Sequence, residues 1–222
     1  MVDEGKIKIG DKFFEENELS AKYKTDSLTI DRAILELVNS ENICVLNGKI
    51  FSCNDDIMKR PAGKISSFFS ETSEQNLKAS SKILGQEVVP CNRKSQSLLQ
   101  LKDNEQVIKI DRLRLVDDQP LAFQTNYVPY KFCSDLVKED LRNQSFQKLL
   151  MDKYEIRLKK ALEFVQAIPS FVILAKLLEI DIHIPILKVE RIAYIENDIP
   201  AVLSILLFRG DKYKYSSWLT EL

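Results

Sequence analysis

Two arginines stand two positions apart in the segment "DRLRL". On a β-strand such side chains point to the same face, so Arg112 and Arg114 would present neighbouring guanidinium groups. Like charges this close repel each other unless an anion or carboxylates lie between them. Ser145 begins a predicted helix, "FQKLLMDKY", whose free N–H groups and dipole attract negative charge. These residues predict a phosphate or carboxylate pocket; the alternative is an exposed strand face with salt bridges to Asp111 or Asp117.

Cysteine and histidine spacing indicates neither a metal site nor a disulfide framework. The four cysteines stand far apart without a CxxC pair, and the single histidine, His183, has no nearby cysteine. Zinc sites and disulfide scaffolds require closer, paired spacing or an oxidising compartment. We therefore expect free thiols in a reducing cytoplasm, with no metal and no cofactor.

The bulk composition is that of an ordinary globular protein. The 222 residues are 45% hydrophobic and 29% charged, with a formal net charge of −1, which gives no overall attraction to nucleic acid or membrane. No segment approaches the roughly 18 apolar residues of a membrane span, and the N-terminus lacks a signal-peptide core. We expect a cytoplasmic protein of one large or two modest domains.

The first part of the chain has the pattern of a winged helix. "ELSAKY" and "LTIDRAILELV" have helical spacing, and "KTDS" between them predicts a turn with Asp26 or Ser27 as N-cap of the second helix. Asn47-Gly48 in "NICVLNGKIFSC" predicts a tight β-hairpin. We assign residues 1–56 to this domain, 57–66 to a linker with Pro61 and Gly63, and 67–222 to a second domain.

The second domain contains two segments of similar sequence, which we call the internal echo. "IKIDRLRLVDDQPLAF" and "LKVERIAYIENDIPAVL" each comprise a strand with an acid-Arg pair, a polar turn ending in proline and a return strand. Asp111-Arg112 matches Glu190-Arg191, and Pro120 matches Pro200. Two similar hairpins among helices predict one antiparallel sheet built by approximate duplication, or a chance likeness. A helix is expected from about Ser70 to Ser80.

The order of these segments resembles one family. "DRLRLVDDQPLAFQTNYVP", "SFQKLL" and "IPAVLSILLFRGDKYKY" are similar to the UTRA effector-binding domain of HutC-type regulators in the GntR class. "GDKFFEENELSAKY" resembles the same family's winged helix, and the likeness covers nearly the whole chain. It implies an α+β fold: an N-terminal winged helix-turn-helix joined to a mixed α/β, chorismate-lyase-like UTRA domain with a mostly antiparallel sheet. It also implies a homodimer.

The resemblance further implies roles for individual residues. Arg112 and Arg114 would hold an anionic group, Ser145 would supply a helix-terminus contact, and Ser67 beside Phe68 would cap the first helix of the domain. The remaining positions expected to line or support the pocket are Gln124, Gln147, Glu163, Arg209 and Tyr213.

Several positions depart from the family pattern. The return strand often carries Glu where this chain has Gln124, the helix often carries Tyr at Gln147, and Val202 or Leu203 stands where the last hairpin often has Glu. The anion-binding end is kept while the other end changes. Such a site should not bind the ammonium of an amino sugar in the usual way.

The predicted DNA-reading helix is acidic. The family's Ser-Arg-x-Thr-Val-Arg is replaced by "DSLTID", so Thr29 survives and both arginines are absent. The family's long first helix is also reduced to a stub before Gly5. Residues 1–56 contain seven basic and twelve acidic residues, a net charge of −5, which opposes phosphate binding. The candidate DNA contacts are Lys24, Ser27, Thr29, Arg32, Asn47 and Lys49.

These features predict a metabolite-responsive bacterial transcriptional regulator, a repressor that binds operator DNA and a small anionic effector such as a phosphorylated sugar. One alternative is a ligand sensor that has lost DNA binding and acts through a protein partner. Another is an enzyme related to chorismate lyase, but no Ser-His-Asp or Cys-His set is present. We therefore expect no enzymatic activity and no membrane partner.

Overall fold

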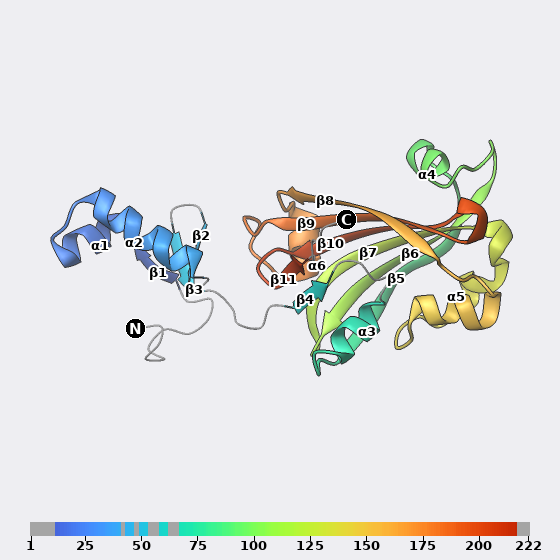
Figure 1. The fold of residues 1–222 in the computed structure, drawn as a ribbon, viewed down its shortest axis with the longest axis horizontal. Coiled ribbons are helices and arrows are strands. Elements are labelled where there is room, and N and C mark those ends of the chain that lie inside the picture. Colours follow the sequence, from blue (N-terminus) through green and yellow to red (C-terminus); the bar gives the residue numbers. More distant parts are fainter. Residues whose placement is uncertain (1–11, 41–42, 47–48, 53–57, 62–66, 217–222) are drawn as a thin grey trace, which may run out of the picture. The chain divides into compact units, whose positions relative to one another are not determined.

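The computed structural model describes residues 12–40, 43–46, 49–52, 58–61 and 67–216. The chain divides into two compact units, Met1–Ile57 and Met58–Leu222 (Figure 1). The fold class predicted from the sequence is confirmed: the first unit contains a helix-turn-helix with a β-hairpin, and the second is built on a mostly antiparallel sheet.

The first unit is a small winged helix. Its strands pair antiparallel in the order β1-β3-β2. Its elements are β1 (Lys12–Glu15), α1 (Glu16–Tyr23), α2 (Ser27–Asn39), β2 (Ile43–Leu46) and β3 (Lys49–Ser52). Asp26 is the N-cap of α2, because its side chain accepts a hydrogen bond of 2.9 Å from the Thr29 backbone N–H. The expected Asn47-Gly48 turn lies outside the described residues.

The second unit contains a six-stranded antiparallel sheet in the order β5-β6-β7-β10-β9-β8. Its strands are β5 (Ala79–Pro90), β6 (Gln106–Val116), β7 (Gln119–Pro129), β8 (Lys160–Ile168), β9 (Ile186–Tyr194) and β10 (Pro200–Arg209). The two echoing segments form the hairpins β6–β7 and β9–β10, which lie side by side at the centre of the sheet. The expectation of one sheet containing both hairpins is confirmed.

Polar turn residues close both hairpins with left-handed backbone. Asp117 and Asp118 have φ values of 46° and 63° between β6 and β7, and Asn197 and Asp198 both have φ of 58° between β9 and β10. Asp and Asn tolerate this conformation better than other non-glycine residues. The local sequence thus determines where each hairpin reverses.

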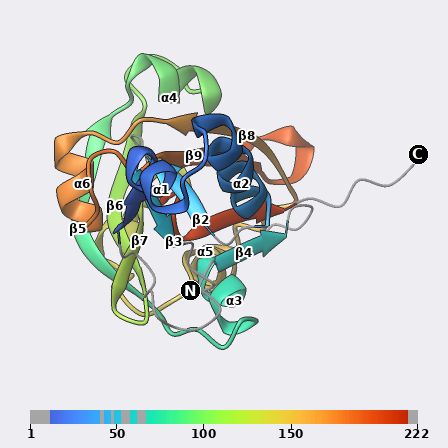
Figure 2. The same ribbon diagram turned by 90° about the vertical axis from the view of Figure 1, so that its left-hand side faces the viewer.

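Helices cover both faces of the sheet. These helices are α3 (Phe68–Ser73), α4 (Arg93–Leu98), α5 (Phe146–Tyr154) and α6 (Val172–Leu178), with short 3-10 helices at Tyr130–Phe132, Ser134–Lys138 and Glu196–Asp198. In two perpendicular views, α3 and α5 lie on one side of the sheet and α4 on the other (Figures 1 and 2). Leu174 and Leu178 of α6 pack with Leu113 of β6, whose side chain points to the face opposite Arg112.

Two expectations differ from the structure. The helix expected over residues 70–80 is α3, which ends at Ser73, and β5 begins at Ala79. The assigned linker 57–66 contains strand β4 (Met58–Pro61), which pairs in parallel with β11 (Tyr213–Ser216). Met58 is buried with Phe208 and Tyr213, so long-range packing decides the conformation of a segment whose Pro and charges suggested a loop.

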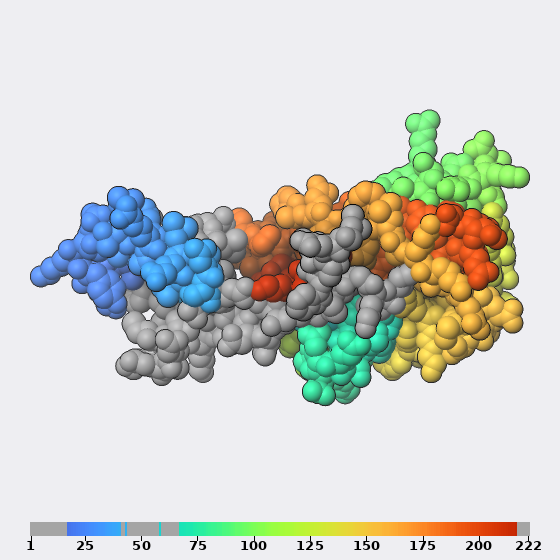
Figure 3. Space-filling view, in the orientation of Figure 1, coloured from blue at the N-terminus to red at the C-terminus, as the bar shows by residue number. Residues whose placement is uncertain are grey.

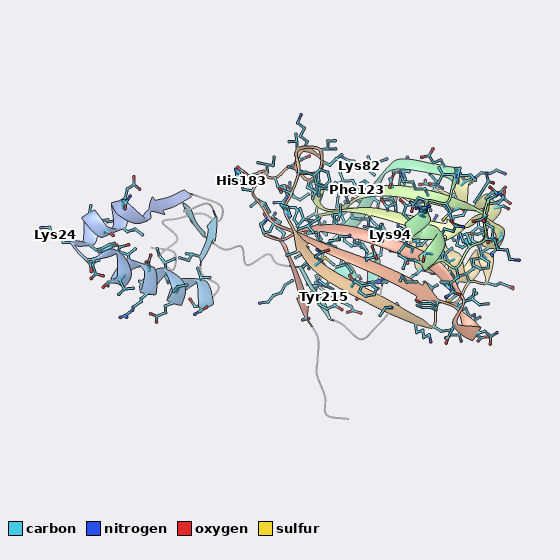
Figure 4. All side chains as sticks on the ribbon, turned by 90° about the horizontal axis from the view of Figure 1, so that it is seen from above. Lys24, Lys82, Lys94, Phe123, His183 and Tyr215 are labelled. Carbon is cyan, nitrogen blue, oxygen red and sulfur yellow. The ribbon has the colours of Figure 1, made fainter. Side chains whose placement is uncertain are left out.

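Within the described residues, no helix is long and apolar enough to cross a membrane. The same part of the chain holds no group of three or more His, Cys, Asp or Glu side chains placed to bind a metal ion. His183 is exposed on the loop between α6 and β9 (Figure 4).

Candidate functional site

One face of the six-stranded sheet carries a belt of polar side chains between two apolar clusters. At one end, Ile108 and Ile110 pack with Phe146 and Leu150 of α5. At the other, Ala122, Val189 and Phe208 pack with Phe68 of α3. The polar side chains between the clusters are Arg112, Arg114, Gln124, Asn126, Arg191 and Ser204. Polar groups placed between apolar clusters are costly unless they serve a ligand or one another.

Arg112 is buried at the centre of this belt, with 1% of its surface exposed. Its Nη2 donates to Asn126 Oδ1 at 2.9 Å and to Gln124 Oε1 at 3.3 Å, and its Cζ lies 5.2 Å from the centroid of the Phe146 ring. Its Nε and Nη1 are buried without a hydrogen-bond partner in the described structure. Two donors of this buried cation are therefore unpaired among the described residues.

Arg114 lies beside it on the same face of β6 and is 2% exposed. Its Nη1 donates to Ser81 Oγ at 2.8 Å, and its Cζ lies 4.2 Å from the Phe68 ring centroid and 5.1 Å from that of Phe69. The Arg114 Nε is also buried and without a partner among the described residues. Aromatic faces stabilise a cation but accept no conventional hydrogen bond.

The electrostatics of the pair favour an anion. Burial lowers the pKa of Arg112 to about 10. Burial, together with the nearby Arg112 charge, lowers the pKa of Arg114 well below its ordinary value, while Glu71 opposes this shift. The ion pairs formed by the described residues include neither guanidinium. An anion between them would supply the missing acceptors and offset the charge repulsion.

Two helix starts border the same space. Ser67 caps α3 by accepting from the Ser70 N–H at 3.1 Å, and Ser145 caps α5 by accepting from the Lys148 N–H at 3.3 Å. Gln147 in the first turn of α5 faces the cavity. Figure 3 shows the α3 segment (teal) and the α5 segment (yellow) next to each other on the surface.

The cavity between these elements comprises about 620 Å³ of space, part of it open to solvent. Its lining residues are Ser67, Phe68, Phe69, Glu71, Arg112, Arg114, Gln124, Asn126, Phe146, Gln147, Leu158, Arg191, Ala193, Val202, Ser204, Leu206 and Phe208.

Six of the ten residues proposed from the sequence line this cavity: Ser67, Phe68, Arg112, Arg114, Gln124 and Gln147. Ser145 caps α5 at its border. Glu163 stands outside the lining and pairs with Arg191, and Tyr213 lies stacked behind Phe208 with ring centroids 3.6 Å apart. These side chains support lining residues instead of reaching the cavity.

Arg209 is placed elsewhere. Its Nη1 donates to the Pro120 and Leu178 carbonyl oxygens at 3.3 and 3.4 Å, and its Nη2 pairs with Asp211 at 2.8 Å. The side chain therefore holds β7 and α6 to the end of β10. A pattern in the sequence could not show this, because both carbonyl acceptors are distant in the chain.

Four polar lining residues were absent from the sequence prediction: Glu71, Asn126, Arg191 and Ser204. Arg191 could have been predicted from the sequence, because the internal echo aligns it with Arg112. The structure places both arginines in the cavity, one from each central hairpin. Asn126 and Ser204 lie on return strands, where only the register identifies the face.

In the first unit, the candidate DNA contacts cluster around the turn and the start of α2. Lys24 has φ of 52° in the turn and is exposed (Figure 4), as are Ser27, Thr29 and Arg32. The Thr29 hydroxyl donates to Asp26 Oδ2 at 2.9 Å, so this proton is used within the cap. Asn47 and the side chain of Lys49 lie outside the described part of the chain.

Comparisons with known proteins agree on one family. A family model described as the UTRA domain matches residues 74–214. The HTH-type transcriptional repressor NagR of Bacillus subtilis is 19% identical over 208 residues, covering 93% of this chain and 85% of that protein. The mannosyl-D-glycerate transport/metabolism system repressor MngR of Escherichia coli is 21% identical over 215 residues, covering 97% and 89%.

The fold likewise has a solved counterpart. The crystal structure of PhnF from Mycobacterium smegmatis superposes with a TM-score of 0.72 at 18% identity, covering 100% of this chain and 96% of that one. The relatives are transcriptional regulators and not enzymes. Because the UTRA match spans more than half of the chain, the protein belongs to the UTRA-domain family, the HutC-type transcriptional regulators of the GntR class.

Proposed function

We propose that this repressor-like regulator is controlled by a small anionic metabolite, such as a phosphorylated sugar, which binds the UTRA cavity and changes the affinity of the winged helix for operator DNA. The observation that carries the proposal is the pair of buried guanidiniums, Arg112 and Arg114, which both line the cavity and together have three buried nitrogens without a hydrogen-bond partner among the described residues. Charge-assisted hydrogen bonds to an anion are among the strongest that a protein can form.

A phosphate group matches these donors in number. It offers three acceptor oxygens, which suit Nε and Nη1 of Arg112 and Nε of Arg114. The first turn of α5 begins at the same cavity with Phe146, whose ring already lies against Arg112, and its dipole adds to the attraction. An anion bound at Arg112 would therefore lie close to the N-terminus of α5, and such a helix can shift its position when the charge beside it changes.

We further propose that the regulator acts as a homodimer in the cytoplasm. Strand β8 is the last strand on one side of the sheet, and its Leu162 and Phe164 side chains are 47% and 53% exposed. An exposed apolar edge strand favours antiparallel pairing with a second copy. Light scattering should show a dimer, and Phe164→Glu should shift it toward the monomer; Lys148→Glu, on an exposed position of α5, is the matched control.

Fluorescence anisotropy with duplex DNA from upstream of its own gene tests the proposal. Saturable, sequence-selective binding should fall with salt, and a phosphorylated sugar should alter it. Arg112→Met should retain DNA binding while losing the sugar-phosphate response. Arg142→Met, which removes an exposed arginine paired with Asp140, should behave as wild type. Selective DNA binding that no phosphorylated compound changes would contradict the effector part of the proposal.

One observation favours a second candidate, a sensor that acts through a protein partner. Residues 1–56 carry a net charge of −5, and Asp26 and Asp31 lie at the start of the reading helix. Such a surface repels a phosphate backbone. Failure to bind any duplex at low salt, together with an intact anion response, would select this candidate over the operator-binding one.

A further inference from the structure

A row of polar side chains crosses the cavity floor at right angles to the strands. The register places Glu163 of β8 opposite Arg191 of β9, Arg191 opposite Ser204 of β10, and Ser204 opposite Asn126 of β7. Directly opposed residues of antiparallel strands project to the same face. Asn126, Ser204 and Arg191 all line the cavity, so the row extends from the anion end near Arg112 toward the opposite edge of the sheet.

Arg112 sets the direction of the hydrogen bonds in this row. A guanidinium can only donate, so the Asn126 atom that it contacts at 2.9 Å is the amide oxygen. The Asn126 amide nitrogen therefore faces the other way and donates to Ser204 Oγ at 2.6 Å. Ser204 accepts this bond, and its hydroxyl proton has no acceptor among the described residues. That proton is available to a ligand in the cavity.

Gln124 is oriented by the same constraint. Its Oε1 accepts from Arg112 Nη2 at 3.3 Å, which leaves the Nε2 amide group as the free donor. The floor thus offers donors at Gln124, at Ser204 and at the two central arginines. The Gln124, Asn126 and Ser204 oxygens each already accept one hydrogen bond, whereas the Gln124 Nε2 group and the Ser204 hydroxyl proton donate to none of the described residues.

At the far end of the row, the residue that lines the cavity is Arg191, which is also a hydrogen-bond donor. The Nε of Arg191 pairs with Glu163, and Glu163 Oε2 accepts from the Tyr215 hydroxyl at 2.9 Å. Arg191 lines the cavity, whereas Glu163 stands behind it. Among the described lining residues, the one carboxylate is Glu71 on α3, which interacts electrostatically with Arg114 at the anion end.

We infer that the cavity selects an anionic effector whose second polar end is an oxygen acceptor, and that it rejects an ammonium there, with Ser204 and Gln124 as specificity-determining residues. The ligand class is a phosphorylated sugar or sugar acid without a free amine; this inference rests on the proposed function. An ammonium at this end would lie near the positive charges of Arg112 and Arg191 and opposite the donors of Ser204 and Gln124, while the one lining carboxylate among the described residues, Glu71, interacts with Arg114 at the anion end.

The inference is tested by comparing the affinities of the full chain for two ligands that differ at a single group. Glucose 6-phosphate and glucosamine 6-phosphate share the phosphate and the ring, and differ in a hydroxyl or an amine. Calorimetric titration at a pH that keeps the amine protonated should show the hydroxyl ligand binding at least about tenfold more tightly, the usual cost of unpaired polar groups. 6-Phosphogluconate, which adds a carboxylate, should bind at least as well as glucose 6-phosphate.

Variants of Ser204 separate the two ends of the site. Ser204→Ala should weaken glucose 6-phosphate about five- to tenfold, as expected for loss of one hydrogen bond, and leave inorganic phosphate unchanged. Ser204→Asp adds an acceptor and should reverse the preference in favour of glucosamine 6-phosphate. Ser134→Ala, at an exposed position in a 3-10 helix, is the matched control for folding and binding.

The outcomes distinguish this inference from the function on which it rests. If inorganic phosphate and both sugars fail to bind, the anion site itself is wrong. If phosphate binds but the amine ligand binds as well as or better than the hydroxyl ligand, the donors of Ser204 and Gln124 do not select the effector. Equal affinity of both sugars and inorganic phosphate would likewise overturn the inference, because the sugar would then not contact the row.

Discussion

Replacing Arg112 with methionine is expected to stabilise the ligand-free protein and to abolish its response to anions. Methionine fills similar space with an apolar, flexible chain. Arg112 is 1% exposed, and two of its nitrogens lack partners, so its charge is held in the folded state at a free-energy cost. Function, and not stability, would then explain its presence.

The cost follows from the pKa. Burial lowers the pKa of Arg112 from 12.5 to about 10, and at 1.36 kcal/mol per pKa unit this is about 3 kcal/mol against the folded charged state. Because the unfolded chain holds its proton to higher pH, the cost is complete below about pH 10 and fades as pH rises toward the unfolded pKa. Methionine removes this cost but leaves Asn126 Oδ1 and Gln124 Oε1 without their donor, a loss of about 1–2 kcal/mol.

The net expectation is therefore a gain of about 1–2 kcal/mol. For a chain of this size, that gain corresponds to a rise in Tm of roughly 2–8 °C. Thermal unfolding of the full chain should be followed with and without inorganic phosphate, using the transition that phosphate shifts in the wild type. Phosphate at about 100 times its Kd should stabilise the wild type by about 2.7 kcal/mol and leave Arg112→Met unchanged.

The control is Arg142→Met, whose side chain is two-thirds exposed and paired with Asp140; it should change neither stability nor the phosphate response by much. A loss of more than about 3 kcal/mol in Arg112→Met, with phosphate stabilisation retained, would refute the reasoning. Arg112 would then be a structural residue whose hydrogen bonds to Asn126 and Gln124 outweigh the cost of its burial.

Three further outcomes are expected. Arg209→Met should lower the free energy of unfolding by about 2–3 kcal/mol, because two buried carbonyls and Asp211 lose their donor; a tenfold weaker phosphate affinity in this variant would place Arg209 in the site after all. Asp31→Arg should raise DNA affinity in the anisotropy assay and steepen the dependence of log K on log salt by about one; an unchanged slope would mean that α2 does not face the backbone. Burial raises the pKa of the Cys133 thiol to about 12. Because the thiol ionises at lower pH in the unfolded chain than in the folded protein, its contribution to stability should be complete below its ordinary pKa and fall as pH rises above that value. Cys133→Ala should lessen this fall, measured as urea unfolding midpoints across the pH range above the ordinary thiol pKa.

Local sequence was sufficient for much of the fold. The cap at Asp26, the polar hairpin turns and the Ser145 start of α5 each depend on neighbours a few residues away, so their residue types reveal them. The two-residue spacing of Arg112 and Arg114 also places both on one strand face without any knowledge of the sheet. The internal echo predicted two hairpins in one sheet, and they occupy its centre.

Other features depend on contacts that no local pattern contains. Met58–Pro61 became a strand because β11, more than 150 residues later, offers it a partner. The sequence predicted Arg209 as a pocket residue, but in the folded protein its Nη1 donates to the carbonyl oxygens of Pro120 and Leu178, which are distant in the chain.

By itself, the sequence determined the order of the two domains, the central hairpins and the pair of arginines on one strand face, because helix caps, turns and strand alternation are short-range properties. The tertiary structure alone decided which further polar residues join the cavity. Asn126, Ser204 and Arg191 become neighbours only through the register of β7, β10 and β9. The direction of each hydrogen bond in that row depends on the buried guanidinium of Arg112, which can only donate.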